Sequence, residues 1–404
     1  MKILHIARYF QPGMGYQENG LLPAQKRLGH EVCLITSDRY APHPNFQETV
    51  NWSEKGRIVG AGRATEQGID VIRLPVAWEW PAHWWVVWKG LWEAVATVRP
   101  DVIHTHCAVI ASSTFQVLWG NLRRRYPLVL DEHNNYFNIM PYTMPKRFLY
   151  AFFKYGVRPV LMRTVGRTLA ISHEAQRFLH KELGIRPEFT RITPLGADPG
   201  RCPRSLDDAR RVREQLKIPG DAVVLVNAGK ITASKDNHIL LEAMARLCRR
   251  TDRAYLLMIG NAPTDYRKQL EGIIRRRDFG ERVRWIGFLP HGELFAHYAA
   301  ADIGVWPGDA SITYLECASC AVPLVLADED YNRYAMTNNN GLFFKRGDAD
   351  DLAAALYRLV SDDRLRREMG QNARQLIEQE LNWDALAKQS ISIYQEVIEQ
   401  GRSN

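Results

Sequence analysis

Two lysines five residues apart are the clearest sign of chemistry in this sequence of 404 residues. Lys230 and Lys235 flank a glycine-containing loop, residues 229–236, that directly follows the apolar run 222–228. If that run is a strand of a doubly wound sheet, its carboxyl end is where such a sheet binds ligands. The two ammonium groups could together neutralise a diphosphate. The competing interpretation is two solvated surface lysines, the commoner fate of this residue type.

A second glycine loop follows the first apolar run of the chain. Gly13 and Gly15 precede a helical pattern, and glycines let a backbone approach an anion at a helix N-terminus. The nicotinamide fingerprint G-x-G-x-x-G is not completed, because Glu18 takes the third glycine's place. A tight turn and a ligand-binding loop both remain open here.

Acidic residues in the second half allow several interpretations. Glu316 lies in an otherwise small and apolar helix start, so it either accepts internal hydrogen bonds or grips a ligand hydroxyl. Asp309 upstream could cap that helix. Residues 328–330 read Asp-Glu-Asp, but they lack a supporting metal ligand, so we expect a solvated acidic turn.

The cysteine and histidine patterns predict no metal site. Cys317 and Cys320 have no second pair, which favours a packed core position. His104 and His106 alternate along an expected strand, so we expect them on opposite faces, where they could not hold one metal ion.

Short apolar runs alternate with helical patterns in both halves, which is typical of βαβ units and parallel sheets. Two such sets in tandem predict two doubly wound domains that face a cleft. We expect domains at 1–198 and 199–380, with Pro and Gly clustered at the boundary, and a final helix at 381–404 that crosses back to the first domain. The expected strands are 3–7, 31–36, 70–75, 101–106, 127–131 and 168–172 in the first half, and 222–229, 254–260, 283–288, 303–307 and 323–327 in the second.

The positive charge lies entirely in the first half. Residues 1–198 carry 24 Lys and Arg against 16 Asp and Glu, whereas residues 199–404 carry 29 of each, and eight of the 11 Trp lie in the first half. Positive charge beside clustered Trp favours an anionic membrane surface over nucleic acid. The composition excludes a disordered or disulfide-stapled protein. With no signal peptide and no apolar stretch near 20 residues, we expect a cytoplasmic protein, peripheral to the membrane if it touches one.

Two segments could meet that membrane or an acceptor. The first is a helix expected to present Trp84, Trp85, Trp88 and Trp92 as an aromatic face. The second runs from Lys146 to Arg167, where basic and aromatic residues interleave and no acid occurs. The alternative is that both segments pack their aromatic residues on the first sheet.

The order of motifs along nearly the whole chain resembles the retaining glycosyltransferases of family 4, which have the GT-B fold. The segments that carry the resemblance are LGHEVCLIT (28–36), DVIHTH (101–106), LVLDEH (128–133), LAISHEA (169–175), GAD (196–198), AGKITASKD (228–236), MIGNAP (258–263), WIGFLP (285–290), LECASCAVPLV (315–325) and NNNGLFFKRGDADDLAAAL (338–356).

This resemblance implies roles for individual residues. Lys230 and Lys235 would hold the nucleotide-sugar diphosphate, and Glu316, the second acid of the family's E-x7-E motif, would bind the ribose. His133 matches a histidine beside the reacting sugar. One departure stands out, because Gly308 occupies the place of the motif's first acid, and Asp309 could replace it through a one-residue shift. The remaining donor-binding residues would be Gly13, Gly15, Gly229, Gly287, Ser311, Ile312 and Thr313.

The implied reaction is transfer of a sugar from a nucleoside diphosphate to an acceptor hydroxyl, with retention and without a metal or other cofactor. Two ammonium groups would stabilise the departing diphosphate most in the transition state. We expect a front-face route in which the leaving phosphate helps to deprotonate the acceptor, a lipid-linked or cell-surface glycan precursor. The alternatives are a nucleotide-sugar 2-epimerase and a degenerate sugar-nucleotide-binding subunit, the latter suggested by Gly308.

Overall fold

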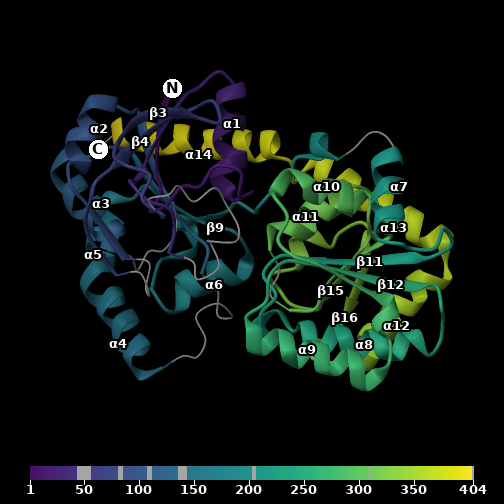
Figure 1. Cartoon of the computed structure of the whole chain (residues 1–404). Coiled ribbons are helices and arrows are strands. Elements are labelled where there is room, and N and C mark those ends of the chain that lie inside the picture. The colour runs from purple at the N-terminus through teal and green to yellow at the C-terminus, as the bar shows by residue number, and fades with distance from the viewer. Residues whose placement is uncertain are drawn as a thin grey trace. The chain divides into compact units, whose positions relative to one another are not determined.

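Every run predicted as a strand forms a strand in the computed structural model of this protein. The structure describes residues 1–42, 56–80, 85–106, 112–134, 143–202, 206–308 and 311–402. It divides into two α/β units, the first made of Met1–Leu195 with Trp383–Asn404 and the second of Gly196–Asn382 (Figure 1).

The first unit is built on an eight-stranded sheet of order β10-β9-β8-β7-β1-β2-β4-β3. Its neighbouring strands are parallel except β3 and β4. The order reverses at the neighbours β1 and β7, the kind of point where doubly wound sheets bind ligands. The strands are β1 (Lys2–Ile6), β2 (Glu31–Ser37), β3 (Gly62–Glu66), β4 (Ile69–Leu74), β7 (Val102–Thr105), β8 (Leu128–Glu132), β9 (Arg167–Ala170) and β10 (Thr190–Ile192).

Helices cover both faces of this sheet. Because side chains alternate along a strand, Leu4 packs into one core with α2, α3 and α6, whereas Ile3 packs into another with α14. The helix α14 also lies along α1, where Gly20 is required because a Cβ there would lie 2.1 Å from the Trp383 ring. The helices are α1 (Gln17–Arg27), α2 (Leu91–Val98), α3 (Ser112–Arg124), α4 (Met144–Phe152), α5 (Arg158–Thr164), α6 (His173–Lys181) and α14 (Trp383–Arg402), with a π-helical turn at Phe153–Val157 between α4 and α5.

The tryptophan-rich segment differs from its prediction. Instead of one helix, it contains the antiparallel pair β5 (Val76–Trp80) and β6 (Trp85–Trp88), followed by α2. Trp88 is buried and donates to Ser37 Oγ, and Trp92 is half-buried. The predicted aromatic helix face is therefore wrong, while Trp84 lies outside the described residues.

The second unit has a six-stranded parallel sheet of order β13-β12-β11-β14-β15-β16. Its order reverses between β11 and β14. In Figure 1, α8, α9 and α12 lie along one face and α10 and α11 along the other. The elements are β11 (Val223–Ala228), β12 (Ala254–Ile259), β13 (Val283–Ile286), β14 (Ile303–Trp306), β15 (Leu324–Ala327), β16 (Gly341–Phe344), α7 (Leu206–Gln215), α8 (Asn237–Cys248), α9 (Thr264–Arg277), α10 (His291–Ala299), α11 (Ile312–Ser319), α12 (Ala349–Ser361) and α13 (Asp363–Gln379).

The segment 381–404, expected as a final helix, contains α14. Across the described residues, none of the helices combines the length and the apolar character needed to cross a bilayer.

Candidate functional site

Lys230 and Lys235 line the same pocket in the second unit. The pocket lies at the carboxyl ends of β11 and β14, the two strands between which the sheet order reverses. Its other lining residues are Asn227, Ala228, Gly229, Trp306, Pro307, Gly308 and Ser311. The structure thus brings the two lysines together at the ligand-binding edge of the sheet.

Hydrogen bonds to one carbonyl shape the floor of this pocket. Both Trp306 Nε1 and Thr313 Oγ1 donate to the Ala228 carbonyl, at 2.9 Å each. The next residue, Gly229, has φ +126°, a backbone conformation that side chains disfavour. A Cβ at Gly229 would lie 3.5 Å from Ser311 Oγ, so the N-terminus of α11 borders the glycine. Such a helix start favours a phosphate.

The position of Gly308 has a steric explanation. A Cβ there would lie 2.5 Å from the carbonyl carbon of Lys235 and 2.8 Å from its Cα. No side chain fits unless the backbone that carries Lys235 moves. The glycine therefore lets that loop approach β14, whereas an acid at this position would displace one of the lysines.

The charges in the pocket repel each other. Burial and, to a smaller extent, the charge of the neighbouring Lys235 lower the pKa of Lys230 to about 8. Asp236, the nearest acid in the sequence, accepts from Arg346 at 3.1 Å. An anionic ligand would relieve the repulsion between the two lysines.

Glu316 is buried in α11, and its two carboxylate oxygens differ. Oε1 is hydrogen-bonded to Nε2 of His291, the first residue of α10, whereas the buried Oε2 has no hydrogen-bond partner among the residues that the structure describes. Arg201 in turn contacts His291 Nδ1 at 2.9 Å. A buried acceptor without a donor is costly, so a ligand hydroxyl would fit here. The partnership with His291 was not predicted, because the two residues lie 25 positions apart.

The remaining predicted residues of the second unit are distributed as follows. Ile312 begins α11, and Gly287 follows β13, where a Cβ would lie 3.5 Å from Asn261 Oδ1. Asp309 lies outside the described residues. In the acidic turn, Asp328 and Asp330 both bind Arg333, at 2.6 and 3.2 Å.

In the first unit, the glycine loop joins β1 to α1. Gly13 and Gly15 have φ angles of +78° and +69°, which explains the choice of glycine at both positions. Asn19 fixes the loop, because its Nδ2 donates to the Gln11 carbonyl at 3.2 Å and its Oδ1 accepts from the Tyr16 backbone N–H at 3.1 Å.

His133 follows β8 at the same edge of the first sheet. Its Nε2 lies 3.5 Å from Oδ2 of Asp131, a fully buried carboxylate of β8. The same oxygen accepts from His106 Nδ1 at 2.8 Å and faces His104 Nε2 at 3.4 Å. Asp131 was not predicted, although it lies two residues before His133 in the same motif.

The prediction that His104 and His106 lie on opposite faces is wrong. Their ring centroids are 4.3 Å apart, because successive side chains along a strand point to opposite faces and residues two positions apart therefore share a face. In the second unit, Cys317 is buried as predicted, and Cys320 is partly buried at the end of α11.

Two family models match the chain in succession. The glycosyl transferase 4-like domain matches residues 13–196, and the glycosyl transferases group 1 model matches residues 208–395. Together they extend over both units.

Relatives of known activity agree with these models. The alpha-D-kanosaminyltransferase of Streptomyces kanamyceticus is 25% identical over 73% of this chain and 77% of its own length. The D-inositol 3-phosphate glycosyltransferase of Kineococcus radiotolerans is 27% identical over 59% of each chain.

Solved structures share the fold. Anabaena Alr3699/HepE, determined with UDP and glucose, superposes over 100% of both chains with a TM-score of 0.72 at 18% identity. WaaG, a glycosyltransferase involved in lipopolysaccharide biosynthesis, matches 98% of this chain and 99% of its own with a TM-score of 0.67 at 15% identity. The two successive family matches and this shared fold identify the chain as a glycosyltransferase of the family 4 type with the GT-B fold.

Proposed function

We propose that this glycosyltransferase takes its sugar from a nucleoside diphosphate donor and transfers it, with retention, to an acceptor hydroxyl. The observation that carries the proposal is the convergence of Lys230 and Lys235 on one pocket beside Gly229. Anabaena HepE, which has the same fold, was determined in complex with UDP-glucose.

The pocket suggests a division of roles. The lysine ammonium groups would bind the diphosphate and stabilise the charge that develops on it as the glycosidic bond breaks. Glu316 Oε2 would accept a hydrogen bond from a ribose hydroxyl, while His291 holds Oε1. His133 of the first unit would position the sugar. In the front-face route, the departing phosphate oxygen takes the acceptor proton, so the step needs no separate protein base.

Donor binding is tested by a thermal-shift panel of UDP-, GDP-, ADP- and dTDP-sugars, because a ligand that binds only the folded state raises the melting temperature. We expect one nucleotide to raise it in the parent protein but not in the Lys235→Ala variant. Equal shifts in parent and variant would contradict the assignment of Lys235. NMR of the product anomer tests retention.

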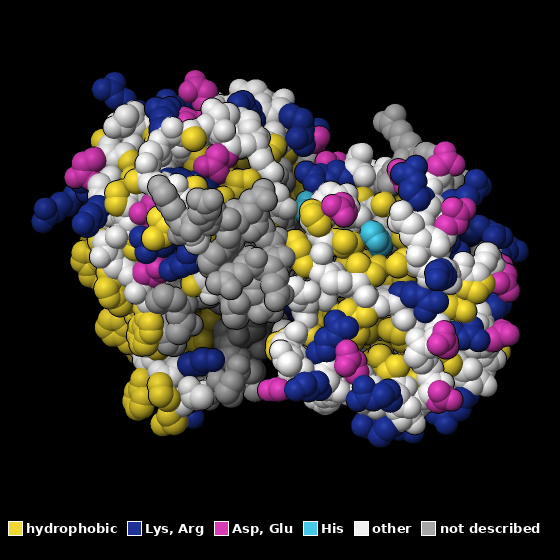
Figure 2. All heavy atoms as spheres, viewed as in Figure 1, with side chains coloured by type: hydrophobic (Ala, Val, Ile, Leu, Met, Phe, Trp, Pro, Cys, Tyr) yellow, Lys and Arg dark blue, Asp and Glu magenta, His cyan; other side chains and the backbone are white. Residues whose placement is uncertain are grey.

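For the acceptor, we propose a lipid-linked or cell-surface glycan precursor reached at an anionic membrane. The support is a surface of α4 and the following π-helical turn, where Phe148, Phe152 and Tyr155 are 69%, 61% and 73% exposed. Figure 2 shows hydrophobic side chains gathered at the lower left, where Figure 1 places α4. Arg147 and Arg163 are exposed nearby, and no acid occurs in residues 133–173. Exposed aromatics within a basic segment fit anionic lipid headgroups.

Flotation with liposomes tests this surface. The parent protein should float with vesicles containing anionic lipid but not with neutral ones, and a Phe148→Ser, Phe152→Ser double variant should stay in the dense fraction. Val59→Ser is the matched control, because Val59 is also exposed in the first unit but lies elsewhere in it. Equal flotation of the double variant and the control would refute membrane binding through α4.

A further inference from the structure

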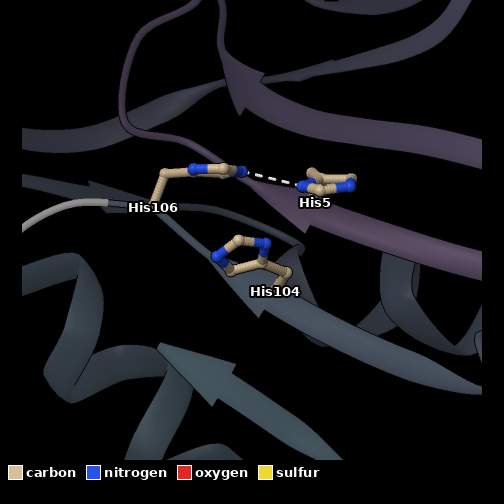
Figure 3. A group of neighbouring side chains, drawn as sticks. All are labelled: His5, His104 and His106. Atoms are coloured by element: carbon tan, nitrogen blue, oxygen red, sulfur yellow. Dashed lines mark hydrogen bonds between the residues drawn. The ribbon is translucent and has the colours of Figure 1, made fainter. Parts of the chain in front are cut away.

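Three histidines come together inside the first unit. His5 of β1 pairs in register with His104 of β7, and His106 follows directly after β7 (Figure 3). Their ring centroids lie 4.3 to 5.2 Å apart, and none of the three is more than 2% exposed. Neither the family matches nor the proposed transfer reaction assigns them a role.

A metal ion is the first candidate for such a cluster, because one nitrogen from each ring lies within 4.8 Å of the others. Two nitrogens bound to one tetrahedral zinc at about 2.0–2.1 Å are separated by roughly 3.3 Å. His5 Nδ1 and His106 Nε2 are only 2.7 Å apart, a hydrogen-bond distance. These two rings are therefore hydrogen-bonded to each other, as the dashed line in Figure 3 marks.

The number of protons follows from the chain of contacts. Gln25 Oε1 lies 2.7 Å from His5 Nε2, His5 Nδ1 lies 2.7 Å from His106 Nε2, and His106 Nδ1 lies 2.8 Å from Asp131 Oδ2. Both ends of this chain are oxygen acceptors, so its three hydrogen bonds need three protons. Two neutral imidazoles supply two. This series of hydrogen bonds therefore holds one proton more than two neutral imidazoles supply, and the positive charge of that proton balances the negative charge of the Asp131 carboxylate.

The orientation of the Gln25 amide supports this count. Ser390 Oγ donates to the Ala387 carbonyl at 2.8 Å, so it accepts from Gln25 Nε2 at 2.9 Å, which leaves Gln25 Oε1 facing His5. Gln25 Nε2 also donates to Tyr394 Oη at 3.1 Å. Tyr394 can then donate to His104 Nδ1 at 2.6 Å, which leaves the proton of neutral His104 on Nε2, toward Asp131.

The additional proton belongs on His106, the ring in direct contact with the carboxylate. Burial alone would lower the pKa of His106, but Asp131 outweighs it and raises that pKa above the ordinary value. Burial, followed by the charge of His106, lowers the pKa of both His5 and His104, and that of His104 falls to about 4. Burial would raise the pKa of Asp131, but His106 and His133 hold it well below its usual range.

Among the described residues, the groups that face this pair lie on several neighbouring elements. They are His5 of β1, Glu18 of α1, His104 of β7, His133 after β8, and Tyr394 of α14. Of these residues, His133 is the one to which the proposed reaction gives a role, that of positioning the sugar.

We propose that His106 and Asp131 are positioning residues for His133: an imidazolium on His106 keeps the buried Asp131 carboxylate ionised, and Asp131 orients His133 through Nε2. The helix α14 completes the arrangement, because Ser390 and Tyr394 fix the Gln25 end of the chain. The catalytic part of this inference rests on the proposed function, whereas the protonation state of His106 does not.

The protonation state is tested by NMR on the full chain with histidine rings labelled with 15N. At about pH 7.5, where a free imidazole is mostly neutral, we expect one ring with both nitrogens protonated. That signal should vanish in His106→Gln and persist in Tyr394→Phe, the matched control that touches the network but not the three-proton chain. A neutral His106 ring in the parent protein would overturn the inference, and this result does not depend on whether any variant folds.

The positioning role is tested by steady-state kinetics. Asp131→Asn keeps the size of the side chain but removes its charge, so we expect kcat to fall at least about tenfold while KM for the donor changes less than about threefold. A purely structural role predicts lower stability with kcat of the folded fraction unchanged, and that outcome would overturn the assignment. A parent protein that binds no nucleotide would instead refute the proposed function and leave the NMR result standing.

Discussion

Replacing Lys230 with methionine should stabilise the protein while impairing its chemistry. The side chain keeps its length but loses its charge, which burial and Lys235 disfavour. The shift of the Lys230 pKa from 10.5 to about 8 would correspond to about 3 kcal/mol if converted fully. The residue as a whole is exposed although it lines the pocket, so solvent screening reduces this value to about 1 kcal/mol.

The lowered pKa of Lys230 makes the stability of the folded protein depend on pH in a definite direction. The unfolded state binds more protons than the folded state between about pH 8 and pH 10.5, so in that window the parent gains stability as pH rises. The variant should lack this gain, and at pH 7 it should melt about 2–4 °C higher than the parent. Its kcat/KM should fall at least about tenfold, because one of the groups that stabilise the departing diphosphate is gone.

Differential scanning calorimetry at pH 7 and pH 10, paired with initial rates, provides the assay. Lys268→Met is the matched control, since Lys268 is an exposed lysine of α9 away from the pocket, and it should change neither quantity. If Lys230→Met melts below the parent at pH 7 and keeps its kcat/KM, the charge on Lys230 neither destabilises the folded protein nor stabilises the transition state.

Three further outcomes are expected. Gly308→Ala should cost about 1–3 kcal/mol in denaturant unfolding and weaken nucleotide binding in calorimetry, because it displaces Lys235, whereas Gly220→Ala, at a site where a Cβ meets nothing within 4 Å, should do neither; equal effects would contradict the steric argument. Glu316→Gln should weaken the binding of a nucleoside diphosphate about tenfold in titration calorimetry but leave the binding of inorganic pyrophosphate unchanged. Equal losses of affinity for both ligands would exclude a ribose contact. Because burial holds the pKa of His104 at about 4, folded protein resists its protonation, and stability should be lost as pH falls from about 6.5 to about 4, by up to roughly 3 kcal/mol. Urea unfolding across that range should show a smaller loss for His104→Asn, and an identical loss would refute the assignment.

The expected strands were predictable because each is a short apolar run followed by turn chemistry, a local signal, whereas β3, β10 and β16 were not predicted. The tryptophan segment was not, because a spacing of four between Trp84, Trp88 and Trp92 suggests a helix. The structure instead places Trp80 against Trp85 across the β5–β6 pair, with centroids 5.8 Å apart. Cross-strand partners of this kind depend on where the chain turns, which residue spacing does not encode.

The sites show the same limit. Lys230 and Lys235 were predictable because one loop carries both of them. The pairing of Glu316 with His291, and the approach of Gly308 to the Lys235 backbone, depend on how separate βα units pack together. The placement of His104 and His106 was mispredicted although its signal is local, because residues two positions apart along a strand share a face.

The return of α14 to the first unit fixes an order of events during synthesis. Gly196–Asn382 is one continuous stretch, so the second unit has all of its residues while the ribosome is still translating the tail. The first unit emerges earlier but lacks Ser390 and Tyr394 until residues 383–402 have followed the second unit out of the ribosome. A chain cut after residue 382 would therefore hold every residue of the second unit but lack, in the first, the contacts of Ser390 to Gln25 and of Tyr394 to His104.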